Sequence, residues 1–177
     1  MERDSLSRRK AQLDKAERDH LQDVVETLRD RVEDNVRFQL TQDGLADEPE
    51  DRDSLDEDLE QLVEAIDLED VDGHTWEDAF EEYVAGVGYT IVNRLAALRC
   101  MEVRDFVDEE VTVFKANGLT PAAETLVHDE FLLEDEAILA AYHSICDELA
   151  DEIEILFDRS STYSLIDPDD DTFEELC

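Results

Sequence analysis

Histidine and cysteine residues, which could bind a metal ion or act as a nucleophile, are few in this sequence, and their spacing matches no complete metal-binding or catalytic motif. His143 and Cys146 stand three positions apart, so a helix would place both side chains on one face, where they could share a metal ion. No second pair accompanies them, and the apolar helical pattern around them favours two core-facing side chains. His20, His74 and His128 are isolated. We therefore expect no metal site and no catalytic residue in this chain.

The glycine and aspartate patterns do not indicate a bound cofactor either. Gly86 and Gly88 form a G-x-G, but the third glycine and the preceding strand of a dinucleotide-binding loop are missing, and no P-loop is present. Residues 167–171 are rich in aspartate but lack the glycine and the terminal glutamate of an EF-hand. We expect this chain to hold no cofactor of its own.

Charge is the most unusual property of the sequence. Its 177 residues include 52 acidic and 15 basic side chains, which gives a net charge of −37. Such a charge repels itself in dilute buffer, whereas about 1 M salt shortens the screening length to about 3 Å. Only three of the basic residues are lysines. We interpret this composition as that of a protein from an extreme halophile. The alternative is an acidic mimic of DNA, which needs carboxylates in a regular double row near phosphate spacing.

Basic side chains are the rarer signal on this acidic background. Arg94, Arg99 and Arg104 follow one another in the least charged part of the chain, and Asn93 stands beside the first of them. These four residues are our candidates for contact with DNA phosphate or with a neighbouring domain. The alternative, which we favour, is that each arginine is paired internally, for instance Arg94 with a carboxylate of the final helix.

The element that must position these residues is a helix over about residues 75–104. Its apolar positions recur at steps of three and four, which is one face of an α-helix; they are Phe80, Val84, Val87, Ile91, Leu95 and Leu98. Thr75 and Asp78 have the spacing of a helix start. Two glycines in its middle lower helix propensity, so we expect a second helix to cross closely there. We predict that this helix is the buried centre of the fold.

The remaining chain predicts an all-α fold, an irregular bundle of about five helices around that centre. We expect a long amphipathic N-terminal helix within residues 1–40, from about residue 5 to 39, then an acidic linker over 41–53. The first forty residues are nearly neutral, so this helix is a candidate contact surface; the alternative, which we favour slightly, is an exposed helix with ion pairs such as Asp14–Arg18. A helical core domain follows over 54–158, with a helix starting at Ser54 and another at Thr120-Pro121. A short strand or loop lies near 111–114, and a final helix over about 135–157 packs along the central one. Residues 159–177 form an acidic tail that looks like the start of a truncated downstream element.

Cysteine count and hydropathy complete the prediction. The three cysteines are an odd number, so no disulfide framework is implied, and Cys100 and Cys146 fall in apolar helical patterns that predict core positions. The sequence has no signal peptide and no run of eighteen apolar residues, so we expect a cytoplasmic protein without a membrane partner.

Two stretches of the sequence resemble a known family. Residues 89–103, YTIVNRLAALRCMEV, place an aromatic residue, Asn-Arg, an apolar run, Arg and Met-Glu in one helix; residues 145–149, 156–158 and 163–165 read ICDEL, LFD and YSL. Both resemble the N-terminal helical region of PglX-type adenine-specific DNA methyltransferases of BREX phage-defence systems, here in a haloarchaeal form. The likeness covers roughly residues 75–177, and residues 1–74 match loosely. Asn93, Arg94 and Arg99 match the family pattern.

The resemblance implies the front piece of such an enzyme without its active site. The family's catalytic domain binds S-adenosylmethionine in a Rossmann-like fold and holds adenine with an Asn-Pro-Pro-Tyr motif, whereas this chain has only Pro49, Pro121 and Pro168. We expect a non-catalytic accessory or scaffold region whose partners are the methyltransferase domain or other defence-complex subunits, with DNA reached only through the parent enzyme. The alternative is a free-standing acidic interaction protein, such as a DNA mimic or a regulatory subunit.

Overall fold

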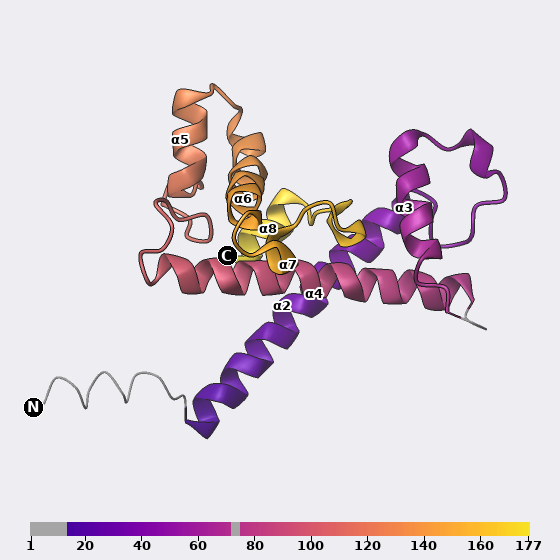
Figure 1. Ribbon diagram of the computed structural model, residues 1–177, viewed down its shortest axis with the longest axis horizontal. Coiled ribbons are helices and arrows are strands. Elements are labelled where there is room, and N and C mark those ends of the chain that lie inside the picture. The colour runs from indigo at the N-terminus through magenta and orange to yellow at the C-terminus, as the bar shows by residue number, and fades with distance from the viewer. Residues whose placement is uncertain (1–13, 72–74) are drawn as a thin grey trace, which may run out of the picture.

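A computed structural model describes residues 14–71 and 75–177 and confirms the predicted all-α class (Figure 1). Its α-helices are α2 (Lys15–Gln42), α3 (Glu57–Asp67), α4 (Trp76–Glu102), α5 (Pro121–Asp129), α6 (Glu134–Ala150), α7 (Glu154–Phe157) and α8 (Asp170–Leu176), with short 3-10 turns η1 (Arg52–Ser54) and η2 (Thr162–Ser164). Within the described ranges no residue is in a strand, so the segment 111–114 is a loop. No helix of these ranges is long and apolar enough to cross a membrane.

Helix α4 is the centre of the fold, as its apolar stripe predicts. It begins where expected, because the Thr75 side chain accepts a hydrogen bond from the Asp78 backbone N–H and the Asp78 carboxylate accepts one from the Thr75 N–H, a capping box. All six residues of the predicted stripe are at most 6% exposed. A Cβ at Gly88 would lie 2.7 Å from the Glu33 side chain of α2, so a helix crosses closely at this glycine. At Gly86 the close neighbour is instead the ring of Tyr163, in η2.

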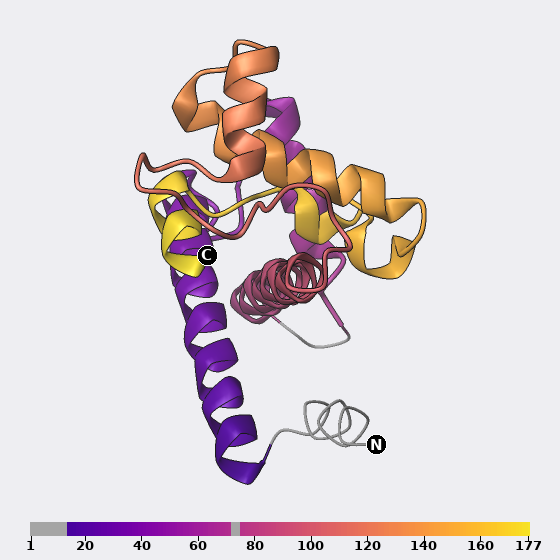
Figure 2. The same cartoon turned by 90° about the vertical axis from the view of Figure 1, so that its left-hand side faces the viewer.

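The neighbours of α4 differ partly from those we predicted. Helix α2 crosses α4 and its N-terminal half projects from the body, as Figures 1 and 2 show, while α3, η2 and α7 cover other parts of α4. Helix α6 packs mainly on α5, so the expected packing of one long final helix along α4 is wrong. The helix ends at Ala150 and restarts as the short α7, which leaves Ile153 37% and Ile155 fully exposed. This break, together with α8, explains why more than five helices form.

Of the two helices that flank the predicted linker, only the start of the second can be compared with the prediction. The described part of α2 is capped by Asp14, whose carboxylate accepts from the Glu17 N–H, so Asp14 serves the helix end and not an ion pair with Arg18. The start we predicted near residue 5 lies outside the described residues. Helix α3 is capped by Asp56 and not by Ser54. The linker itself contributes Leu45, 1% exposed, to the core.

The C-terminal segment is built into the core. Phe173 is fully buried and Leu176 is 8% exposed, and α8 packs on α2 and α6. The Asn35 amide of α2 donates to the Asp169 carboxylate at 2.6 Å, which ties the start of α8 to the N-terminal helix. Cys146 is buried as predicted, but Cys100 is exposed, so the prediction of a core position for Cys100 is wrong.

Candidate interaction surfaces

Arg94 is the best-connected of the four candidate residues, and it faces inward. Its side chain is 2% exposed. The guanidinium donates from Nε to the Leu156 carbonyl oxygen at 2.8 Å, and from one Nη to the Asp158 carbonyl oxygen at 2.7 Å and to the Ser164 Oγ at 2.9 Å. Arg94 is therefore paired internally, although its acceptors are carbonyls and a hydroxyl and not the carboxylate we expected. A side chain this buried is not accessible to DNA phosphate.

Arg94 also joins two segments that lie far apart in the sequence. Its own position lies in residues 89–103, and its three acceptors lie in residues 156–164, after the break that ends α6. Carbonyls released by the end of a helix need donors when they are buried. The fork of the guanidinium supplies several donors at once, so one side chain holds α7 and η2 against α4.

The prediction that His143 and Cys146 both face the core holds for Cys146 only, because His143 is partly exposed. Cys146 is fully buried, and burial raises the pKa of its thiol to about 11, so the thiol is protonated at neutral pH. Its neighbour Tyr142 is also fully buried, and burial raises the pKa of that hydroxyl far above its usual range. His143 Nε2 instead lies 2.7 Å from Oδ2 of Asp167. Across the described residues, no three histidine, cysteine or acidic side chains are placed to hold a metal ion.

The other candidate residues are exposed and do not meet at one site. Asn93 lines a hollow of about 380 Å³ beside Tyr89, Glu154 and Ile155. Arg99 lies nearer the C-terminal end of α4, where one Nη is 3.2 Å from Oε2 of Glu102. Arg104 follows the helix and is exposed. Since a helix rises about 1.5 Å per residue, Asn93 and the end of α4 at Glu102 are separated by roughly 14 Å along the axis. Asn93, Arg99 and Arg104 therefore do not form a compact patch.

One exposed side of α4 carries no charge at all. Its positions are spaced by four, three, four and three residues, which brings them onto one narrow face; we call them the α4 outer face, and they are Tyr89, Asn93, Ala96, Cys100 and Val103, all exposed. At one end the Arg29 guanidinium of α2 lies 4.9 Å above the Tyr89 ring and donates to its hydroxyl at 3.0 Å. At the other end Val103 is 67% exposed.

Sequence reasoning missed Glu102, the last residue of α4. Its side chain is fully buried, and its Oε1 accepts the backbone N–H groups of Val111 at 2.7 Å and Thr112 at 3.0 Å. The Thr112 hydroxyl donates to its Oε2. Glu102 therefore pins the loop that follows α4 back onto the helix end. In the sequence, Glu102 is one carboxylate among many, at the end of an apolar helix, and nothing local distinguishes it from the others.

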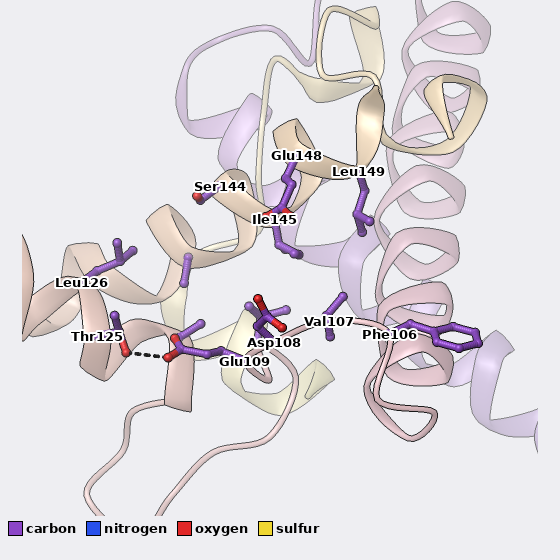
Figure 3. A pocket seen from close by; sticks show the side chains of 13 residues that line it. Phe106, Val107, Asp108, Glu109, Thr125, Leu126, Ser144, Ile145, Glu148 and Leu149 are labelled. Carbon is purple, nitrogen blue, oxygen red and sulfur yellow. Dashed lines mark hydrogen bonds between the residues drawn. The ribbon is translucent and has the colours of Figure 1, made fainter. Parts of the chain in front are cut away.

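The pinned loop forms one wall of a second hollow, with a volume of about 400 Å³. Helices α5 and α6 supply the other walls (Figure 3). Its lining is apolar below and acidic at the edge: apolar residues include Val107, Leu126 and Ile145, and the acids are Asp108, Glu109 and Glu148. In Figure 3 the Phe106 ring points away from the centre of the hollow, toward solvent, and it is 67% exposed.

Comparison with known proteins finds no match: no family model, no curated protein and no solved structure matches this chain.

Proposed function

We propose that this chain is a non-catalytic helical docking module, the N-terminal accessory region of a PglX-type adenine-specific DNA methyltransferase of a halophile. The α4 outer face is the surface that packs on the catalytic domain. The observation that carries this proposal is the absence of charge from an exposed helix face on a chain with 52 acidic residues. Cores of protein interfaces are depleted of charged residues, whereas a surface adapted only to salt has no reason to omit them here.

The position of the outer face supports the link to the methyltransferase family. The face begins at Tyr89 and ends at Val103, which are also the first and last residues of the stretch that resembles the family. Arg94 points to the opposite, buried side of the same helix and holds the second resembling stretch. The two resembling stretches thus serve one purpose: they build a rigid helix that presents an uncharged face.

The apolar face of α2 extends the same surface. Leu21 is 51% and Val24 is 38% exposed, and both continue the stripe that buries Val32 and Val36 against the body. Figure 1 shows this half of α2 projecting away from the other helices. Since a stable interface buries about 800 Å² on each partner, a partner that contacts both helices obtains the area that α4 alone does not provide.

The test combines an activity assay with a binding assay. The purified chain, in about 2 M KCl, is expected to transfer no methyl group from labelled S-adenosylmethionine to adenine in DNA. It is expected to co-purify with a catalytic domain that contains Asn-Pro-Pro-Tyr and is encoded downstream of it. Methyl transfer by the chain alone, or a gene neighbourhood with no such reading frame, would refute the proposal.

A matched pair of substitutions tests the docking face itself. Ala96→Glu places a carboxylate in the middle of the face, where an unpaired buried charge should weaken the complex by about tenfold or more. Ala116→Glu makes the same chemical change on an exposed loop residue outside the face and should leave binding unchanged. Equal affinities of both variants for the catalytic domain would show that α4 does not carry the interface.

A further inference from the structure

The hollow between the loop after α4 and helices α5 and α6 is built independently of the α4 outer face. Its volume of about 400 Å³ is that of a small binding pocket. Aliphatic side chains from three elements form its lining: Val107 and Val111 from the loop, Leu126 from α5, and Ile145 and Leu149 from α6. Glu102 fixes the loop through two backbone hydrogen bonds, so the wall is held in place without a ligand.

The acids at the edge of this pocket are not equivalent. Glu109 already has a hydrogen-bond partner, because its Oε1 accepts from the Thr125 hydroxyl at 3.0 Å, drawn as a dashed line in Figure 3. Asp108 and Glu148 have no hydrogen-bond or ion-pair partner within residues 14–71 and 75–177. No lysine or arginine lines the pocket. Its edge therefore offers two uncompensated negative charges beside an apolar floor.

We propose that this pocket binds a segment of a partner polypeptide in which an apolar side chain is flanked by lysine or arginine on both sides. The apolar side chain fills the floor, and the two cations pair with Asp108 and Glu148. These acids come from different elements, the loop and α6, with Ile145 between them in the view of Figure 3. A polypeptide with a cationic residue on each side of an apolar residue can pair with both carboxylates at once. A ligand with a single amine would leave one of the two carboxylates unpaired.

High salt weakens this preference, because exposed ion pairs are partly screened, but it does not reverse it. At a screening length of about 3 Å, long-range attraction between the acidic chain and any basic molecule is lost, but ion pairs in direct contact persist. The pocket therefore selects by contact and not by overall charge. This inference does not rest on the proposed role beside a methyltransferase, since it concerns other residues and is tested with the purified chain alone.

The experiment titrates isotope-labelled protein with three synthetic peptides in about 2 M KCl and follows backbone amide shifts by NMR. The peptides are acetyl-Gly-Lys-Phe-Lys-Gly-amide and its forms with both lysines replaced by glutamine or by glutamate. We expect the lysine peptide to shift the amides of Val107, Ile145 and Leu149 in a saturable way. The glutamine form should bind about fivefold more weakly, the loss of two exposed ion pairs, and the glutamate form more weakly still.

Two double variants with the same change in charge locate the contact. Asp108→Asn with Glu148→Gln should weaken the lysine peptide to the level of the glutamine peptide. Glu50→Gln with Asp53→Asn, at two exposed residues in and just before η1 that do not line the pocket, should leave its affinity unchanged. All four changes are near-isosteric and at exposed positions, so folding is preserved, and thermal melting checks this.

Several results would overturn the inference. They are equal binding of the three peptides, equal behaviour of the two double variants, or amide shifts confined to residues outside the pocket. Binding of 4-phenylbutylamine as tight as that of the lysine peptide would assign the pocket to a free amine instead. Sedimentation that shows self-association through the same residues would assign it to a second copy of the chain.

Discussion

Replacing Arg94 by alanine should destabilise the fold by about 3 kcal/mol, because three buried acceptors lose their donor at once. The acceptors are the carbonyls of Leu156 and Asp158 and the hydroxyl of Ser164, at 2.7–2.9 Å from the guanidinium. A hydrogen bond from a charged donor contributes about 1.5–3 kcal/mol, so three of them amount to roughly 5–9 kcal/mol. Burial of the guanidinium itself costs several kcal/mol, which the variant recovers, and the net loss is about 3 kcal/mol.

The assay is urea unfolding followed by far-UV circular dichroism, in about 2 M KCl to screen the self-repulsion of the chain. With a urea dependence of about 2–3 kcal/mol per molar, the midpoint of Arg94→Ala should fall by roughly 1–1.5 M. Arg94→Lys keeps the charge but loses the fork of donors, so its midpoint should fall about half as far. Arg104→Ala is the control, because this exposed side chain has no partner in the described parts of the chain; its change should stay within about 0.5 kcal/mol.

The result that would refute the reasoning is a midpoint for Arg94→Ala within about 0.3 M of the unchanged protein, or equal shifts for Arg94→Ala and Arg104→Ala. Either outcome would mean that α7 and η2 are held against α4 without Arg94, by apolar contacts and by the hydrogen bond from the Tyr83 hydroxyl to the Thr162 carbonyl oxygen. The interpretation of Arg94 as an internal tie would then be lost.

Three further predictions concern the centre of the fold. Glu102→Ala leaves two buried backbone N–H groups without an acceptor and should destabilise the protein by about 3 kcal/mol in thermal melts. An unchanged melting temperature would mean that the hydrogen bonds of Glu102 do not stabilise the loop after α4. Gly86→Ala places a Cβ 2.2 Å from the Tyr163 ring and should cost about 1–3 kcal/mol despite the better helix propensity of alanine, so a gain in stability would contradict the close approach. At pH 7.5 maleimide should label exposed Cys100 but not buried Cys146, because the Cys146 pKa of about 11 leaves little thiolate. Labelling of Cys146 should appear only as the pH rises toward that value or when the protein unfolds. Rapid labelling of Cys146 at pH 7.5, located by mass spectrometry, would contradict its buried position.

The sequence by itself determined the helices and most of their ends, because these depend on interactions within about four residues. The Thr75–Asp78 capping box and the Thr120–Pro121 start are local in this sense, and both are confirmed. The apolar stripe of α4 and the close crossing at Gly88 also followed from spacing alone. The misplaced start at Ser54 is a local error of the same kind, since Asp56 offers an equally good cap two residues later.

Only the tertiary structure decided what each exposed or buried side of these helices meets. The acceptors of Arg94 lie 62 to 70 residues further along the chain, and the Leu156 and Asp158 carbonyls are free to accept because α7 ends at Phe157. The exposure of Cys100 and of the other uncharged residues of the α4 outer face depends in the same way on which neighbours α4 has. Periodicity shows that a helix has an apolar face, but the identity of the surface that covers it is a property of contacts between distant segments.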